Sequence, residues 1–372
     1  MLQGFLFICT VLFANFSWAN DFTYRELTTL IQSQNVKTVD ALIPLLPAVL
    51  RQNHVLVHGS RSRQTSSLMA PRVILFTKFA DFRPHHPTSG LALAFNGGGE
   101  AMADHSVEVI EYNPQVRGFE LHEITFDKAG VQAPQFSGTN PSRCLMCHRA
   151  DPRPNWDSYP FWPGVYGSIH TPPALPRLSI GQEEINQYLQ FKADTSEHPR
   201  YKSLNLPADI KQLALNNTFM GLGFAYQNYG RVRRQIDQTN LLPKYKYYIQ
   251  GLFAGCLHPR GFLPARIHAQ LQSKLGYSLE EMYMQTEQRI LLERTREQAF
   301  FDLYNKVHII AALRFIFEGQ GIDIADWSIS MDSNYRFSTG NRGIGDFPFY
   351  LEIESMTKDC DELKRLSLAE FP

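Results

Sequence analysis

The sequence has no excess of charge of either sign. It contains 36 Lys and Arg residues against 36 Asp and Glu residues, so its formal net charge is zero. A balanced chain shows no global signature of binding to nucleic acid or to an anionic membrane surface. Long apolar runs are also missing beyond the N-terminal segment, so the sequence predicts no later transmembrane helix.

Cysteine is scarce, and the signatures of several enzyme classes are missing. The chain has five cysteines and a single CxxC pair, whereas a closed zinc site needs a second Cys/His pair at ligand spacing. Gly97-Gly98-Gly99 lacks the following Lys-Ser/Thr of a phosphate loop, so it predicts a turn. No Ser-His-Asp order or paired-carboxylate pattern is distinctive enough to predict hydrolytic chemistry.

The N-terminal segment has the features of an export signal. Leu2 to Phe16 are nearly all apolar, and small residues follow at Ser17 and Ala19. This pattern predicts a signal peptide over residues 1–19 and a periplasmic mature protein without a stable membrane span. The segment Met1–Gly4 carries no Lys or Arg, and an uncleaved anchor helix is the alternative, although the run is short for a bilayer.

The one CxxC pair is followed at once by histidine, in Cys144-Leu145-Met146-Cys147-His148. Two thiols at this spacing can each add to one haem vinyl group, and the adjacent imidazole can ligate the iron. Over these five residues the chain resembles the c-type cytochromes, which implies one covalent haem c with His148 as proximal iron ligand. The alternatives are a structural zinc half-site, a redox-active dithiol or a Cys144–Cys147 disulfide. The preceding Gly138–Pro141 predicts a haem-attachment loop and not the strand that precedes a thioredoxin-like dithiol.

An aromatic segment follows the motif. Its prolines forbid a helix, yet it carries large aromatic side chains, among them Trp156, Tyr159 and Trp162. We expect these side chains to cover the haem, or alternatively to form a lid on an ordinary core. Cys144 to Ser168 resembles a group of exported bacterial cytochrome-c-like proteins in which CxxCH is followed by Arg-Pro and then Trp-Pro-Gly-x-Tyr-Gly-Ser. The resemblance extends to Ser60–Gln64 and Pro71–Phe76, and it implies haem and export without implying a reaction.

The sixth iron ligand separates the two haem functions. A Met or His opposite His148 would favour electron transfer with an unknown redox partner, whereas an open site would suit a peroxidase-like enzyme or a gas sensor. The distal candidates are His170 and Met220, and the same argument applies to Met69, Met282 and Met284. A third reading is a non-haem interaction protein whose cysteine pair is structural. Core packing is the alternative role for each methionine.

Hydrophobic periodicity predicts an α+β fold. A helical pattern with Thr38 or Asp40 as a cap covers Phe22–Leu50, and residues from about His54 to Phe126 predict an antiparallel β unit. The expected strands are His54–His58, Arg72–Phe76, Leu91–Phe95, Val107–Tyr112 and Phe119–Ile124, the last two joined by a turn. The remainder is predicted to be mainly helical, with helices from Pro207 to Asn216 and from Phe224 to Gln238, and capping boxes at Ser179–Gln182 and Ser278–Glu281.

These patterns divide the mature chain into residues 20–140, an N-terminal helix plus the β unit, and residues 141–372, the haem-attachment loop and the helical region. Two sets of arginines are expected mainly as solvated charge: Arg61/Arg63/Arg72, with haem propionates as the alternative partners, and Arg231/Arg233/Arg234. The spacing of Arg231 and Arg234 places them on one face of the predicted helix, and their alternative partners are haem propionates or acidic neighbours. Cys256 and Cys360 can form a disulfide in an oxidising compartment, with two buried free thiols as the alternative.

Overall fold

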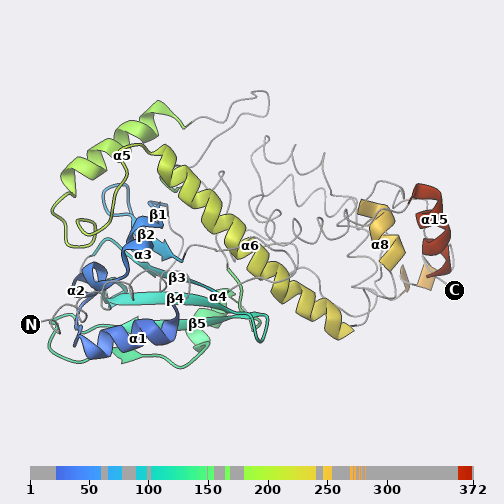
Figure 1. Cartoon of the computed structure of the whole chain (residues 1–372), viewed down its shortest axis with the longest axis horizontal. Coiled ribbons are helices and arrows are strands. Elements are labelled where there is room, and N and C mark those ends of the chain that lie inside the picture. The colour runs from blue at the N-terminus through green and yellow to red at the C-terminus, as the bar shows by residue number, and fades with distance from the viewer. Residues whose placement is uncertain are drawn as a thin grey trace, which may run out of the picture.

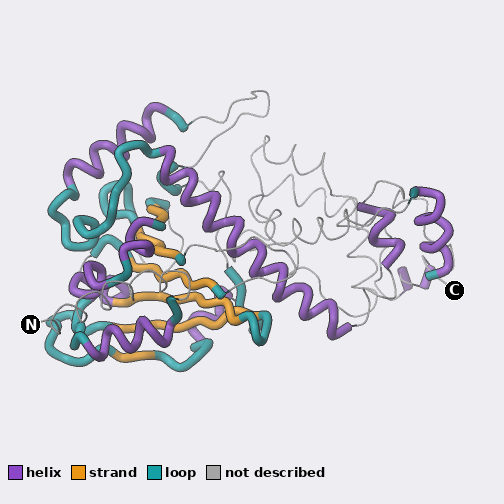
Figure 2. Tube along the Cα trace, in the orientation of Figure 1, coloured by secondary structure: helices purple, strands orange, loops and turns teal. Residues whose placement is uncertain are grey.

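The fold is α+β, with an antiparallel sheet in the N-terminal half followed by helices (Figures 1 and 2). The computed structural model describes residues 22–59, 66–77, 89–98, 102–148, 150–154, 164–167, 180–239, 246–253 and 359–370, with isolated positions between 269 and 281. Within these ranges no helix combines the length and the apolar character that crossing a membrane would take. The six strands are β1 (His54–Val57), β2 (Arg72–Phe76), β3 (Gly90–Phe95), β4 (Ser106–Asn113), β5 (Gly118–Thr125) and β6 (Gln135–Phe136).

The sheet is a simple meander in which each strand pairs antiparallel with the next along the chain. All five predicted strands are confirmed, with ends that differ by at most one residue. The predicted turn between β4 and β5 is also confirmed, because Asn113 pairs with Gly118 and Arg117 adopts a φ of 47°. The two-residue strand β6 is too short to leave a periodic signal, and the sequence did not predict it.

Both faces of the sheet are buried. The first core lies between one face and the helices α1 (Tyr24–Ser33), α2 (Val39–Leu42), α3 (Ala48–Gln52) and α5 (Gln182–Asp194). The second core lies on the opposite face, where Met220 and Phe224 of the long helix α6 (Lys211–Thr239) pack on alternate strand residues, including Val57, Ile74, Ala94, Ile110 and Leu121. Burial of both faces explains why β1, β2 and β3 are apolar almost throughout and alternate poorly.

The helix ends show which sequence signals were decisive. Thr38 caps α2 as predicted, since its hydroxyl accepts a hydrogen bond from the Ala41 amide at 3.1 Å. The capping box at Ser278–Glu281 is confirmed in both directions. The box at Ser179–Gln182 was wrong, because α5 begins at Gln182 with Gly181 at its N-cap and no side-chain cap. The predicted continuation of the Ser278 helix lies outside the described residues.

Helix α6 replaces the two helices predicted over this region. It runs without a break through Gly221, where the gap between the two predicted helices implied a junction, and on through Gly223. Each glycine costs about 0.5–1 kcal/mol in a helix interior. Burying Met220 and Phe224 against the sheet offsets that cost, so packing decides the outcome. Figure 1 shows α6 passing the sheet diagonally toward the C-terminal helices.

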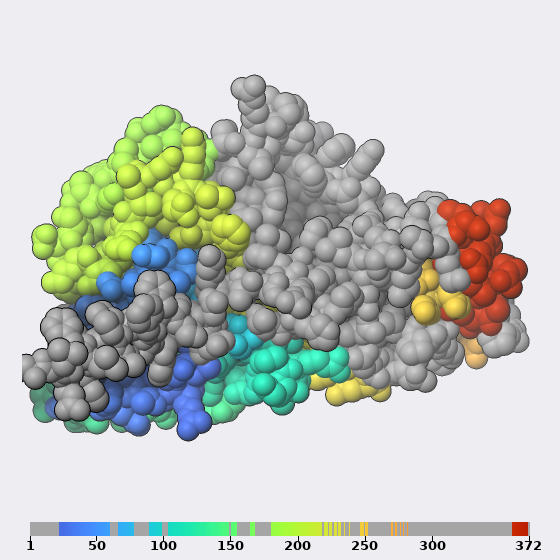
Figure 3. Space-filling view, in the orientation of Figure 1, coloured from blue at the N-terminus to red at the C-terminus, as the bar shows by residue number. Residues whose placement is uncertain are grey.

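Two of the C-terminal helices form a small pair. Helices α8 (Lys246–Phe253) and α15 (Cys360–Ala369) lie side by side at the end of the molecule remote from the sheet (Figures 1 and 3). The Glu370 carboxylate joins them by accepting hydrogen bonds from the backbone amides of Tyr247 and Tyr248, at 2.6 and 2.7 Å. These amides lie at the start of α8, where backbone donors have no helical acceptor.

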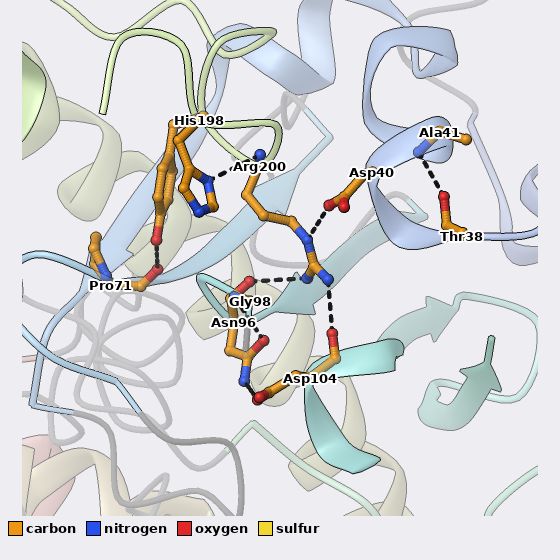
Figure 4. Close-up of polar contacts among 10 residues, drawn as sticks. Thr38, Asp40, Ala41, Pro71, Asn96, Gly98, Asp104, His198 and Arg200 are labelled. Atoms are coloured by element: carbon orange, nitrogen blue, oxygen red, sulfur yellow. Dashed lines mark hydrogen bonds and ion pairs between the residues drawn. The ribbon is translucent and has the colours of Figure 1, made fainter. Parts of the chain in front are cut away.

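Arg200 connects three parts of the first half of the chain (Figure 4). The guanidinium is 4 % exposed, forms an ion pair with Asp40 of α2, and donates to the carbonyls of Asn96 at 3.1 Å and Asp104 at 2.8 Å. The Asn96 amide in turn bonds to the Asp104 carboxylate. A single cation thus holds α2, the end of β3 and the approach to β4 to the segment between α5 and α6.

Glu111 gives the first core a pH dependence. It lies on the α1 face of β4, accepts a hydrogen bond from the Tyr24 amide, and faces Glu26 of α1 and Glu120 of β5. Burial, and to a smaller extent these two carboxylates, raise the pKa of Glu111 from 4.5 to about 7. The folded state therefore holds this proton more tightly than the unfolded state. The contribution of Glu111 to the free energy of unfolding is fully present below about pH 4.5 and declines as the pH rises toward 7.

We predict that Glu111→Gln removes this decline. The variant should match the wild type near pH 4 and exceed its unfolding free energy by about 1–3 kcal/mol at pH 8. Urea unfolding across this pH range measures the difference. Glu183→Gln, at an exposed position of α5, is the matched control and should follow the wild type throughout. Parallel curves for Glu111→Gln and the wild type would contradict the assignment.

Candidate functional site

The CxxCH motif lies on a short helix fixed to the edge of the sheet. Asn140 adopts a φ of 56° and pairs with Leu121 of β5 twice, through its own amide and through its side-chain oxygen, both at 2.8 Å. Helix α4 (Ser142–His148) begins two residues later, and its first turn is closed by the Cys144 amide donating to the Pro141 carbonyl at 2.9 Å. Gly138–Pro141 is a loop as predicted, but the CxxCH motif itself is helical.

The two thiols lie one helical turn apart on α4. An i, i+3 spacing places them on neighbouring positions of one helix face. Both cysteines are free; Cys144 is half-buried and packs against the second core, whereas Cys147 is exposed. Burial raises the pKa of Cys144, Glu108 raises it further, and Arg143 opposes them. A redox-active dithiol depends on a lowered thiol pKa, so this environment does not favour that alternative.

His148, at the end of α4, is held in one orientation. Its Nδ1 atom lies 2.5 Å from the carbonyl oxygen of Arg153. A carbonyl can only accept, so Nδ1 carries the proton in this bond. Burial lowers the pKa of His148, against the opposing effect of the Arg153 carbonyl and Glu108, and the ring is neutral at neutral pH. The lone pair then lies on Nε2, which is the state that a metal-ligating histidine takes.

The turn that supplies this carbonyl is anchored to α6. Asp151 pairs with Arg231 at 3.1 Å and with Arg234 at 2.6 Å, and Arg231 is completely buried. The predicted spacing of these two arginines on one helix face is confirmed, but the solvated surface expected for them was wrong. They pair with an acidic neighbour because α6 packs across the sheet and covers this turn. The side chain of Arg233 is not among those that the structure describes.

A row of four charged residues borders the motif on the same face of the sheet. Glu108 of β4 lies directly opposite Glu123 of β5, an arrangement that is unfavourable for like charges. Each carboxylate has its own cation: Arg72 pairs with Glu108, and Arg143 of α4 pairs with Glu123. Arg72 is 13 % exposed, so the solvated role expected for it was wrong. Arg61 and Arg63 lie outside the described residues.

Of the distal candidates, the described residues place Met220 and Met69. Met220 is completely buried in the second core, the cluster against which Cys144 packs. Met69 is exposed. The other candidates His170, Met282 and Met284 lie outside the described residues, as do the aromatic residues Trp156, Tyr159 and Trp162.

The described end of the aromatic segment is part of the sheet scaffold. Val165 bridges to Val57, and the Tyr166 amide donates to Leu56, so the segment covers the free edge of β1. Tyr166 packs between Tyr188 and Phe191 in the first core, on the sheet face opposite Cys144. This position explains why glycine follows Tyr166 in the aromatic segment. Gly167 has a φ of 85°, and a Cβ atom there would lie 2.6 Å from the backbone nitrogen of Ala214.

Sequence reasoning missed the residues that orient the motif. The Arg153 carbonyl and Asp151 carried a weak signal, because each of these two charged residues is followed by a proline in Asp151-Pro152-Arg153-Pro154. Asn140 carried a stronger one, because Asn before Pro is a common turn residue and tolerates a positive φ. The ion pairs of Glu108 and Glu123 depend on strand register, which only the assembled sheet supplies.

Among the described residues, no three His, Cys, Asp or Glu side chains gather closely enough to hold a metal ion. Cys360 is disulfide-bonded, as the predicted Cys256–Cys360 pairing requires, and Cys256 lies outside the described residues.

Comparison of the chain with protein families, with curated proteins and with solved structures finds no match.

Proposed function

We propose that this chain is an exported c-type haem protein that transfers electrons in the periplasm. Cys144 and Cys147 hold one haem through thioether bonds, and His148 is the proximal ligand. The haem supplies a one-electron redox centre. The chain's own residues position the thiols and the imidazole and limit access to them.

The observation that carries this proposal is the bond between His148 Nδ1 and the Arg153 carbonyl. It fixes the ring tautomer and leaves Nε2 to bind a metal, a second-shell arrangement that metal-ligating histidines commonly have. The donor set beside it also fits haem c. Two free thiols precede the histidine on one helical face, and the raised pKa of Cys144 suits a protonated thiol that adds to a vinyl group.

Met220 favours electron transfer over open-site chemistry. It is a thioether that is completely buried on the same side of the sheet as Cys144. A methionine as sixth ligand fills the iron and raises the reduction potential, as in the electron-transfer cytochromes. The alternative of a haem enzyme or sensor requires an open position instead. Absorbance of the reduced protein, with and without carbon monoxide, tests the choice, and a carbon monoxide shift in the wild type would contradict electron transfer through a filled site.

We predict that Met220→Leu converts the protein into one that binds carbon monoxide. Leucine conserves the buried volume, so the stability should change by less than about 1.5 kcal/mol while the thioether is lost. The reduced variant should shift its absorbance with carbon monoxide, and the reduced wild type should not. Phe224→Leu, in the same core cluster, is the matched control and should behave as the wild type. Absence of a shift in Met220→Leu would exclude Met220 as the ligand.

A further inference from the structure

We propose that Asp151 is a positioning residue for His148, held by Arg231 and Arg234 of α6 so that the Arg153 carbonyl stays aimed at the imidazole. This inference rests on the proposed function and adds a residue to it. Helix α6 would then help to orient the iron ligand, although it lies far from the CxxCH motif in the sequence.

The connection between the Asp151 side chain and the Arg153 carbonyl is rigid. Only Pro152 separates Asp151 from Arg153, and Pro154 follows. Proline fixes its own φ and restricts the residue before it to extended conformations. Pro152, Arg153 and Pro154 are all buried. A displacement of the Asp151 carboxylate is therefore passed to the Arg153 carbonyl, because few soft dihedral angles lie between them.

Asp151 is firmly anchored to α6 by two arginines. Arg231 is completely buried, contacts Asp151 at 3.1 Å, and is itself oriented by the Asn228 side chain at 2.8 Å. Arg234 adds a second contact at 2.6 Å and is 25 % exposed. Removing the acidic partner of a buried guanidinium is strongly unfavourable, so the pair holds the turn in one place.

The position of the Arg153 carbonyl affects the properties of His148 as a ligand. The hydrogen bond from Nδ1 to the carbonyl makes the imidazole a stronger electron donor at Nε2. A stronger donor favours oxidised iron, since second-shell hydrogen bonding is one of the means by which a protein sets a haem potential. Loosening the turn weakens this bond and shifts the equilibrium toward reduced iron.

The test is the midpoint potential of the full-length haem protein as wild type, Asp151→Asn, Arg234→Gln and Asp40→Asn. Asp40→Asn is the matched control, because it also removes the acidic partner of a buried arginine, Arg200, in the first core. We expect Asp151→Asn to favour the reduced form at least threefold, where a tenfold change equals about 59 mV for one electron. Arg234→Gln should shift the potential in the same direction by less, and Asp40→Asn should leave it unchanged while lowering stability to urea.

The outcomes separate this inference from the proposed function. Unchanged potentials in both Asp151→Asn and Arg234→Gln would overturn the positioning role and leave the haem proposal standing. Arg234→Gln alone decides the matter if Asp151→Asn does not fold, because Arg234 is partly exposed and its loss is the milder change. An equal shift in Asp40→Asn would show a general loosening and would also overturn the inference. A wild type without haem, established by its mass, would overturn both proposals.

Discussion

Arg200→Met is expected to lower the free energy of unfolding by about 3–5 kcal/mol, the range for breaking a buried ion pair from one side. Methionine fills much of the arginine volume but donates no hydrogen bond. The carboxylate of Asp40 loses its cation, and the carbonyls of Asn96 and Asp104 lose their shared donor. Because domains are stable by only about 5–15 kcal/mol, this is a large part of the total.

Urea unfolding at neutral pH measures this effect as a lower midpoint with an unchanged slope. Lys364→Met is the matched control. It breaks the exposed pair between Lys364 and Asp361 on α15, where solvent screens the charges, so the midpoint should remain close to that of the wild type. A loss below about 1 kcal/mol for Arg200→Met would mean that the three parts of the chain are held together without this cation.

Replacing Cys144 and Cys147 together by serine is expected to abolish covalent haem. Serine hydroxyls do not form the thioether bonds, and α4 keeps its helical shape because both replacements are small. Haem should then be extracted completely by acidified organic solvent, whereas it should stay with the wild-type polypeptide. Met146→Gln lies between the two cysteines on an exposed side of the same helix, and this control should retain haem as the wild type does. Solvent-resistant haem in the double serine variant would contradict the attachment proposed for these thiols.

The sequence predicted the sheet well because each strand carried its own signal. Runs such as Arg72–Phe76 and Leu91–Phe95 are rich in β-branched or large apolar residues and are bounded by polar turns. The Asn113–Gly118 turn set the register of β4 and β5. Local propensity, apolar pattern and turn chemistry agreed at these places. Where they agree, a single sequence is sufficient to predict the strands and their register.

The helical region was predicted less well because packing overrode local signals. Gly221 indicated a break, yet α6 continues through it, since side chains on both sides of it are buried against the sheet. The sequence at Ser179 matched the capping-box motif, but the helix begins at Gln182 with Gly181 at its N-cap. In its first turn, Glu184 accepts a hydrogen bond from the distant Gly167 amide at 2.6 Å. Tertiary contacts of this kind are not encoded in a window of a few residues.

At the candidate site, the motif was visible in the sequence and its surroundings were not. Cys144, Cys147 and His148 were identified by spacing alone. Asp151, Arg153 and Arg231 are separated by up to 80 residues, and their contacts depend on how α6 crosses the sheet. The arginines were expected in solvent because a charged residue is rarely buried without a partner, and a single sequence does not show where the partner lies.

The mass of the exported wild-type chain under denaturing conditions tests the proposed covalent haem most directly. The protein is produced in a host with haem-maturation machinery and compared with the double serine variant. We expect the wild type to carry the mass of one haem on a chain that begins at Asn20, and the variant to have the mass of that chain alone. A wild-type mass without added haem would contradict covalent haem at Cys144 and Cys147.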